Sequence, residues 1–259
     1  MEQPVSSSHY FLLKQRFMRL LVAHYDTSRS GQVPLRLLEG WRGYLMTDGY
    51  DGYNALARTE GVEHLACWAH ARRGFVEAAK VQAKGKRGRA DQAIEQIGQL
   101  YRIEREVRQA TDADRYAARQ ARSLPVLQAL RQWLDKALPA VAPQTALGRA
   151  LAYLDKYWSR LCRYTERGDL PLDNNRCEGA IRPFVVGRKN WLFSDTPAGA
   201  HASALIYSLV QTAKANGLEP YTWLRRVMRQ LPTARTAEDY DALLPWNMHV
   251  TDLATETVS

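Results

Sequence analysis

The chain has 259 residues, of which 46% are hydrophobic, so it can bury a sizeable core in one or two domains. Its 36 Lys and Arg against 27 Asp and Glu leave a formal net charge of +9, a balance that favours polyanionic partners such as nucleic acid. The sequence has no apolar run of roughly 18 residues, which argues against a membrane span, and it lacks the basic start of a secretion signal. Its three cysteines are widely separated, which argues against a disulfide framework. We therefore expect a cytoplasmic protein.

The first third of the chain has the pattern of an α/β sheet. Residues 10–25 are apolar without a clean period and predict either one buried helix or two strands joined at Lys14–Arg16. Asp48 directly follows an expected strand, and strand ends are where open α/β sheets display their chemistry. The elements expected here are a turn over residues 26–31, a helix over 32–40, a strand over 43–47, a helix over 53–60 and a strand over 62–67.

Helices dominate the rest of the chain. A basic, glycine-rich hinge at residues 84–89 is either a solvated loop or one that follows DNA. The expected helices cover residues 68–84, 91–110, 112–121, 124–138, 144–167, 196–217, 219–230 and 236–246. Their apolar rows predict core positions, namely Ile94, Ile97, Tyr101 and Ile103, then Val126, Leu127, Leu130, Trp133 and Leu134, then Leu147, Leu151, Leu154, Trp158 and Leu161.

The stretch Leu170–Trp191 places one acid, Glu178, among amides and cations. Asp173 or Asn174 can cap a helix that begins near Asn175, because a short side chain with an oxygen accepts hydrogen bonds from the unpaired amides of a first turn. Glu178 then lies early in this helix, where the helix dipole favours a negative charge. A carboxylate in that position is suited to holding a divalent cation.

Three cations and an indole lie around this acid, within ten residues of one another. They are Arg182, Arg188, Lys189 and Trp191. Such a mixture suits a phosphate backbone with an exposed base. The structural alternative is a capped surface helix in which Glu178 pairs with Arg182 at i+4.

Several strings resemble the insertion-sequence-66 family of transposases, in that family's order, from about Ser28 to Trp246. The family's Asn-Asn-x-x-Glu motif, which supplies the last acid of an Asp-Asp-Glu triad, reads Asn174-Asn175-Arg176-Cys177-Glu178 here. The other matching strings are Ser28-Arg29-Ser30-Gly31, Thr47-Asp-Gly-Tyr-Asp-Gly-Tyr-Asn54, Cys67-Trp-Ala-His-Ala-Arg-Arg73, Trp191-Leu-Phe-Ser-Asp-Thr-Pro-Ala-Gly-Ala-His201 and Leu243-Leu-Pro-Trp246.

The resemblance implies an α/β fold with a ribonuclease-H-like core and a small mixed sheet, interrupted by a large all-helical insertion and followed by C-terminal helices. It also implies a DNA transposase that uses Mg2+ (or Mn2+) for phosphodiester cleavage and strand transfer. The resemblance implies four parts. Residues 1–84 form the first part of the catalytic domain, and residues 85–169 form the helical insertion. Residues 170–216 complete the core, and residues 217–259 form a C-terminal helical extension.

By resemblance, Asp48 is the second acid and Glu178 the third, and both are catalytic metal ligands. Asp51 competes with Asp48, but the family's acid occupies the position in Thr-Asp-Gly-Tyr, and a plain surface turn is the alternative to both. The residues expected to contact DNA are Asn174, Asn175, Arg182, Arg188, Lys189, Trp191, His70, Arg72 and Arg73. Arg72 and Arg73 face either DNA or solvent.

The string Cys67-x-x-His70, with His64 upstream, resembles half of a zinc site. Structural zinc generally takes four ligands, and the sequence contains no second close pair of Cys or His. We therefore expect Cys67 to be buried at a strand end, with His70 either packed or near the scissile phosphate.

The start of the chain departs from the family. There the first acid belongs to an earlier strand with an Asp-Glu-Thr-like motif, whereas this chain begins Met1-Glu-Gln-Pro-Val. We therefore expect an N-terminally truncated catalytic portion. The alternative is a catalytically inactive DNA-binding remnant of such a transposase. The expected partners are transposon ends and target DNA in the nucleoid, a second copy of the chain on DNA, and other proteins encoded by the same element.

Overall fold

A computed structural model gives the fold of the chain. It describes residues 8–14, 19–26, 28, 30–49, 51–82, 87–180, 182, 186, 196–249, 251 and 253. The chain divides into two compact units. The central unit is Pro34–Asn175, and the terminal unit combines Met1–Val33 with Arg176–Ser259.

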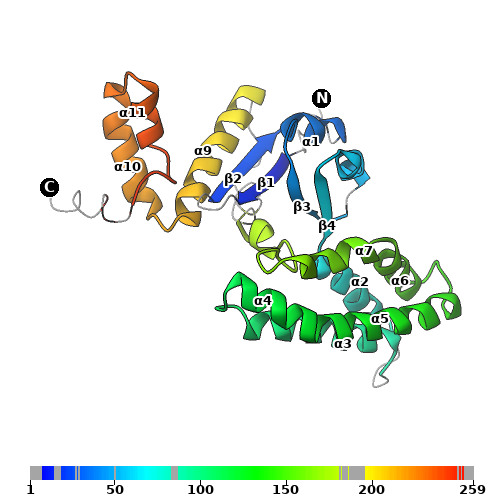
Figure 1. Ribbon diagram of the computed structural model, residues 1–259. Coiled ribbons are helices and arrows are strands. Elements are labelled where there is room, and N and C mark those ends of the chain that lie inside the picture. The colour runs from blue at the N-terminus through cyan, green and yellow to red at the C-terminus, as the bar shows by residue number, and fades with distance from the viewer. Residues whose placement is uncertain are drawn as a thin grey trace. The chain divides into compact units, whose positions relative to one another are not determined.

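Two parallel strands form the sheet of the central unit (Figure 1). Strand β3 (Gly43–Thr47) pairs in register with β4 (Val62–Ala66), so that Thr47 lies opposite Ala66. Both strands lie where the sequence predicted them. The helix expected over residues 53–60 is instead two single 3-10 turns, η1 (Asp51–Tyr53) and η2 (Leu56–Arg58), because the amides after each turn bond three residues back instead of four.

Helices make up the remainder of the central unit. They are α1 (Gln32–Leu37), which begins at the boundary of the unit, α2 (Trp68–Lys80), α3 (Arg89–Glu106), α4 (Asp112–Ala118), α5 (Leu124–Ala137), α6 (Ala146–Lys156) and α7 (Trp158–Cys162), with a π-helical turn, η3 (Arg119–Ser123), and the 3-10 turns η4 (Leu138–Ala140) and η5 (Arg163–Glu166). The helix expected over residues 144–167 is divided at Tyr157, whose backbone (φ −105°, ψ 9°) is not helical. The other expected helices are confirmed to within a few residues at their ends.

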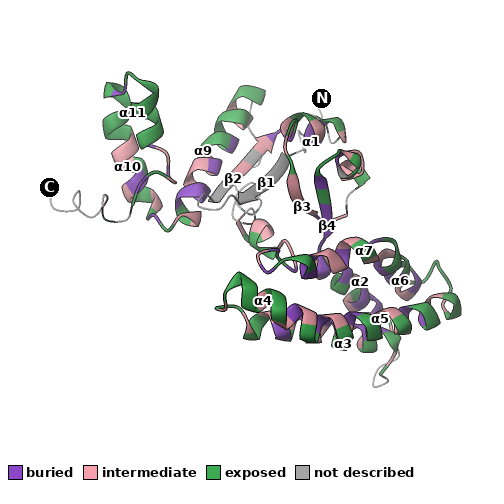
Figure 2. Ribbon diagram, viewed as in Figure 1, coloured by how far each residue is buried: buried purple, intermediate pink, exposed green. Residues whose placement is uncertain are grey.

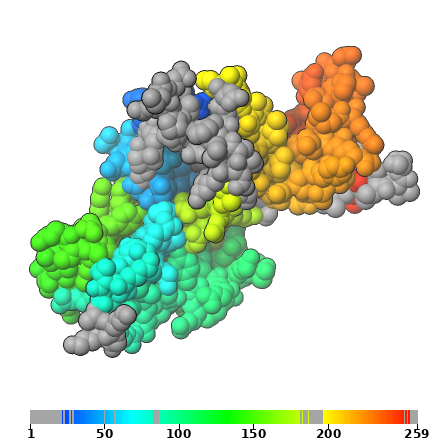
Figure 3. Space-filling model, turned by 180° about the vertical axis from the view of Figure 1, so that it is seen from behind, coloured from blue at the N-terminus to red at the C-terminus, as the bar shows by residue number. Residues whose placement is uncertain are grey.

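One hydrophobic cluster holds α2, α3, α5, α6, α7 and the β4 strand together. Eight residues of the predicted apolar rows on α3, α5, α6 and α7 are buried, as the purple stripes of Figure 2 show, namely Ile97, Ile103, Leu127, Leu130, Leu134, Leu151, Leu154 and Leu161, and the other six are partly buried. Trp68 lies at the centre, fully buried, and its indole N–H donates to the Leu161 carbonyl at 2.8 Å. In the space-filling view of Figure 3, the cyan atoms of α2 lie directly against the teal and green atoms of the helices that follow.

A buried ion pair fixes the π-helical turn in this core. The Arg119 side chain is 1% exposed and forms two hydrogen bonds with the Glu104 carboxylate, at 2.7 and 2.8 Å. The same guanidinium donates to the carbonyls of Tyr164, Arg167 and Leu170. Five hydrogen bonds from one side chain thus join α3 to the chain that leads back toward residue 170.

We expect Arg119→Met to lower the free energy of unfolding by about 3–5 kcal/mol, because it leaves the Glu104 charge and three carbonyls without their donor in a buried site. Urea denaturation followed by circular dichroism measures this loss. The matched control is Arg122→Met, which breaks an exposed pair with Glu106 and should cost less than about 1 kcal/mol. Equal losses for the two variants would contradict the structural role of Arg119.

The terminal unit contains an antiparallel hairpin of β1 (Ser8–Lys14) and β2 (Arg19–Tyr25), with Ser8 opposite Tyr25. Of the two predictions for residues 10–25, two strands is therefore the correct one. Helix α9 (Pro197–Ala215) packs along β2 (Figure 1). Its cap is the predicted Thr196, whose hydroxyl accepts the Gly199 amide at 3.1 Å.

The C-terminal helices are α10 (Pro220–Gln230) and α11 (Ala237–Ala242), joined by the 3-10 turn η6 (Leu231–Thr233). A second hydrophobic cluster around Trp223 of α10 includes the end of α9 and residues that follow α11, Leu243 among them. The Trp223 indole N–H donates to the Leu243 carbonyl at 3.2 Å. None of the helices described for this chain combines the length and apolar character needed to cross a membrane. The chain is thus a mixed α/β protein with mostly helical structure. Its described strands form two separate two-stranded sheets, where the sequence predicted one mixed sheet.

Candidate functional site

The loop after β3 carries the first candidate acid. Asp48 follows Thr47, the last residue of the strand, and is exposed. Gly49 has φ +89°, a conformation that residues with a side chain rarely adopt, and an added Cβ would lie 2.9 Å from the Tyr153 hydroxyl oxygen. A glycine at this position therefore allows the sharp turn that places Asp48 at the carboxyl end of the strand.

Two tyrosines from the helical segment hold this loop. The Tyr153 hydroxyl donates to the Asp48 carbonyl and the Tyr157 hydroxyl donates to the Gly49 carbonyl, each at 3.0 Å. Burial, together with the nearby Cys67, raises the pKa of Tyr153 well above its usual value, so this hydroxyl remains a donor. The backbone of the candidate acid is thus fixed by residues about a hundred positions away in sequence.

Cys67 lies at the same edge of the sheet, because parallel strands have their carboxyl ends together and Cys67 directly follows β4. Its thiol is fully buried, as predicted, and donates to the Asn174 side-chain oxygen at 2.9 Å. The Asn174 amide in turn donates to the sulfur at 3.4 Å. Burial raises the pKa of the Cys67 thiol, which therefore stays protonated. These contacts bring the first Asn of the Asn-Asn-x-x-Glu motif to this edge.

Asp173 organises the beginning of the next helix. Its carboxylate accepts hydrogen bonds from the Asn175 backbone amide at 3.1 Å, from the Asn175 side-chain amide at 2.7 Å and from the Tyr101 hydroxyl at 2.8 Å. Residue 175 is the first helical residue. Asp173 is therefore the side chain that accepts the amide of the first turn, while the Asn174 side chain is used by Cys67.

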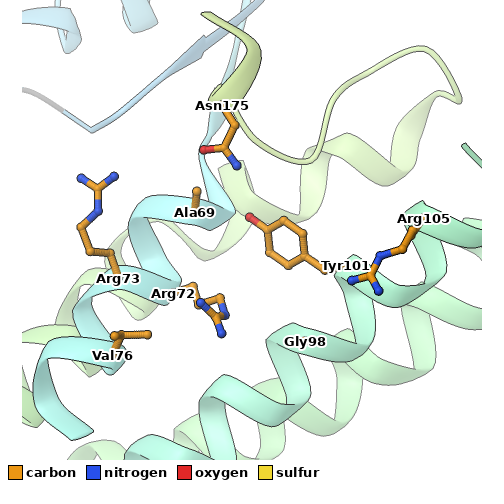
Figure 4. Close-up of a pocket in the computed structure, with 8 residues that line it drawn as sticks. All are labelled: Ala69, Arg72, Arg73, Val76, Gly98, Tyr101, Arg105 and Asn175. Carbon is orange, nitrogen blue, oxygen red and sulfur yellow. The ribbon is translucent and has the colours of Figure 1, made fainter. Parts of the chain in front are cut away.

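Behind this edge, a cavity of about 440 Å3 lies between α2 and α3 (Figure 4). The eight residues that line the α2–α3 cavity are Ala69, Arg72, Arg73, Val76, Gly98, Tyr101, Arg105 and Asn175. Three residues expected to contact DNA, Arg72, Arg73 and Asn175, are thus brought together. The sequence did not indicate Arg105, and it placed Tyr101 in a core row. The four-residue spacing of these two on one helix face was the available signal.

The remaining expected DNA contacts are distributed differently. His70 lies on α2 and is half-buried. Glu178 and Arg182 belong to the terminal unit, Glu178 half-buried in the helical stretch over residues 175–180 and Arg182 exposed. Arg188, Lys189 and Trp191 lie outside the described residues.

No three His, Cys, Asp or Glu side chains gather into a metal-binding group within the described ranges. His64, the third member of the half zinc site, is buried and its Nε2 lies 2.6 Å from the Thr47 hydroxyl. Asp51, the competitor of Asp48, accepts from Asn54 at 3.0 Å and pairs with Lys156 at 3.4 Å. These bonds lower the pKa of Asp51 and engage its carboxylate within its own surroundings.

Sequence comparison decides the family. The pattern described as Transposase IS66 family matches residues 6–202, and that of the IS66 C-terminal element matches residues 208–246. The chain belongs to the IS66 transposase family. Membership accounts for the order of the motifs on both sides of the helical segment, and it makes DNA transposition the general function to which this chain is related.

Two similar proteins from Sinorhizobium fredii carry no functional description. Uncharacterized protein y4jD is 33% identical over 230 residues, which cover 86% of this chain and 44% of that protein. Uncharacterized protein y4qI is 31% identical over 235 residues, which cover 88% of this chain and 43% of that protein. The chain therefore spans less than half the length of these relatives. No solved structure matches it.

His64 gives a pH-dependent prediction. Burial first, and then the charges of Arg160 and Arg163, lower its pKa from 6.5 to about 4. Between these values the unfolded chain binds a proton that the folded chain does not, so stability falls as the pH is lowered through this window. We expect a loss of about 2 kcal/mol between pH 7.5 and pH 5 from this residue.

Urea denaturation at several pH values measures this loss, with His64→Asn, which cannot titrate, as the comparison. The variant should lose about 2 kcal/mol less than the wild type over the same range. An NMR titration of the wild-type imidazole provides an independent reading. An unchanged pH dependence in the variant, or an imidazole pKa near 6.5, would show that the folded protein accepts the charged form.

Proposed function

We propose that this chain is a catalytic region of a DNA transposase of the Asp-Asp-Glu type, which cleaves phosphodiester bonds and joins strands with a divalent metal ion. The observation that carries the proposal is the position of Asp48 in a chain of this family. It is an exposed carboxylate at the carboxyl end of a parallel strand, beside the edge to which Asn174 returns. Ligand and catalytic sites of open parallel sheets occupy this edge.

Asp48 and Glu178 are the proposed metal ligands. Carboxylate oxygens are the donors that Mg2+ and Mn2+ prefer, and Mg2+ is usually held by one or two carboxylates together with water and substrate phosphates. Two carboxylates are therefore enough ligands for one such ion, although the described residues contain no group of three His, Cys, Asp or Glu side chains that could hold a metal. When bound, the ion would lower the pKa of a coordinated water and stabilise charge on the phosphate.

The surrounding residues have separate roles in this proposal. Tyr153 and Tyr157 hold the backbone of the Asp48 loop, so that the carboxylate is presented from a fixed turn. The Cys67–Asn174 contacts fix the chain four residues before Glu178. A backbone held in this way limits where the side chains that it carries can lie, which favours catalysis by positioning.

The ribonuclease-H-like arrangement is part of the same proposal. A parallel pair, β3 and β4, with an acid after the first strand, and an antiparallel hairpin, β1 and β2, are elements that such a core contains. The four-part division at residues 84/85, 169/170 and 216/217 also remains a proposal. In it, the helices from α3 to α7 are the insertion.

Mn2+ binding in a complex with duplex DNA tests the ligands. We expect Asp48→Asn and Glu178→Gln each to weaken Mn2+ affinity at least about tenfold, or 1.4 kcal/mol, because each removes one charged oxygen donor while keeping its shape. Electron paramagnetic resonance of free Mn2+ measures the affinity. DNA binding without metal provides a check that both variants are folded.

Asp51→Asn is the matched control, since it removes an exposed carboxylate three residues from Asp48. It should bind Mn2+ as the wild type does. If Asp51→Asn weakens binding and Asp48→Asn does not, Asp51 is the ligand. If none of the three substitutions changes the affinity, the site does not bind metal through this loop.

DNA binding without strand cleavage is the second candidate function. The observation that favours it is the absence of a three-ligand acidic group among the described residues, since two-metal phosphoryl transfer requires several carboxylates at one point. Incubation of the purified chain with supercoiled DNA and Mn2+ discriminates the two. Cleavage that disappears in Asp48→Asn supports the first function, and binding without cleavage supports the second.

A further inference from the structure

The α2–α3 cavity is strongly positive. Three of its eight lining residues are arginines and none is acidic, among the residues that the structure describes. Arg72 extends from α2 and Arg105 from α3, so the two guanidiniums approach the cavity from separate helices (Figure 4). Neither forms an ion pair within the described part of the chain. Their charges therefore remain available to an anion.

A partly buried hydrogen bond between Tyr101 and Asp173 fixes the wall of the cavity. Tyr101 reaches from α3 toward Asn175, and its hydroxyl donates to Asp173, which also holds both amides of Asn175 (Figure 4). Burial and the negative charge of Asp173 raise the pKa of Tyr101 far above its usual value, so the Tyr101 hydroxyl stays protonated and remains a hydrogen-bond donor. The three hydrogen bonds occupy Asp173, which does not line the cavity.

We propose that the α2–α3 cavity binds a phosphate of the DNA backbone and that Arg72 and Arg105 are the side chains that contact this phosphate. This inference rests on the proposed function, which makes DNA the partner, and it adds Arg105, a contact from the helical segment that the family motifs do not contain. Guanidinium groups match the geometry of phosphate oxygens and stay charged at all relevant pH values. The volume of about 440 Å3 also admits the attached sugar.

The cavity adjoins Asn175, three residues before Glu178. A phosphate held there contacts the segment that leads into the helix of the second candidate acid. The cavity therefore sets the register of the DNA strand on the central unit as well as adding affinity, because contacts to the phosphate backbone set the register of a protein on its duplex.

Salt-dependent DNA binding tests the proposal. Fluorescence anisotropy with a labelled 20-base-pair duplex gives the association constant of the full chain at several salt concentrations. We expect Arg105→Gln and Arg72→Gln each to lower the slope of log K against log salt by about 1, since one phosphate contact contributes about 0.9. This corresponds to about tenfold weaker binding at 0.1 M salt.

Arg102→Gln is the matched control. Arg102 lies on α3, is exposed and carries the same charge, but it does not line the cavity, so its substitution should leave the slope nearly unchanged. Arg102 and Arg105 are both on the surface, so neither substitution should affect folding, and thermal unfolding verifies this. Equal effects of Arg105→Gln and Arg102→Gln would show a general charge effect and overturn the proposal.

Inorganic phosphate distinguishes DNA from a small phosphate-bearing ligand. Isothermal titration should show the wild-type chain binding phosphate weakly and Arg105→Gln binding it less. If Arg105→Gln weakens phosphate binding but leaves DNA binding unchanged, the cavity serves a small anion and the proposal is wrong. If the wild-type chain binds no DNA at any salt concentration, the proposed function fails together with this inference.

Discussion

The structure of the central unit depends on the chain returning, after the helical segment, to the edge of the sheet from which it left. The chain leaves β4 at Cys67 and comes back at Asn174, 107 residues later, where its side chain meets the same sulfur. Closing a loop of this length costs on the order of 4 kcal/mol in chain entropy. The closure is stable because the loop is itself a packed helical body, whose buried side chains, Trp68 and Phe75 among them, each contribute roughly 1.5–3 kcal/mol.

This helical body is more than a spacer between two motifs. Its tyrosines Tyr153 and Tyr157 hold the carbonyls of the Asp48 loop, and Tyr101 holds Asp173 at the point of return. In all three cases a buried or partly buried ring supplies apolar packing while its hydroxyl satisfies a polar group, so one side chain stabilises both the core and the edge. The geometry of the candidate site is consequently set in part by three tyrosines that lie outside the family's motifs.

Local patterns predicted the elements well, because periodicity and caps are properties of neighbouring residues. The strand Gly43–Thr47, the cap Thr196 and the apolar rows of α3, α5 and α6 follow from such patterns. The contacts between segments could not be predicted in this way. Nothing near Tyr101 in the sequence indicates an acceptor 72 residues away, and Arg105 is one cation among 36 until α2 lies beside it. The break at Tyr157 was missed for the same reason, since its hydroxyl bonds to a carbonyl 108 residues away.

The packed helices also explain how a sheet of two strands is stabilised in the central unit. Two parallel strands expose both faces, and a pair of strands alone is marginally stable in water. In the central unit, the cluster around Trp68 covers β4, and the buried Arg119–Glu104 pair joins α3 to the chain returning to Asn174. Removing the helices would therefore free both the loop after β3 and the segment before Glu178. Asp48 and Glu178, the two proposed ligands, are separated in sequence by the helices that fix the backbone of the Asp48 loop and of the chain at Asn174.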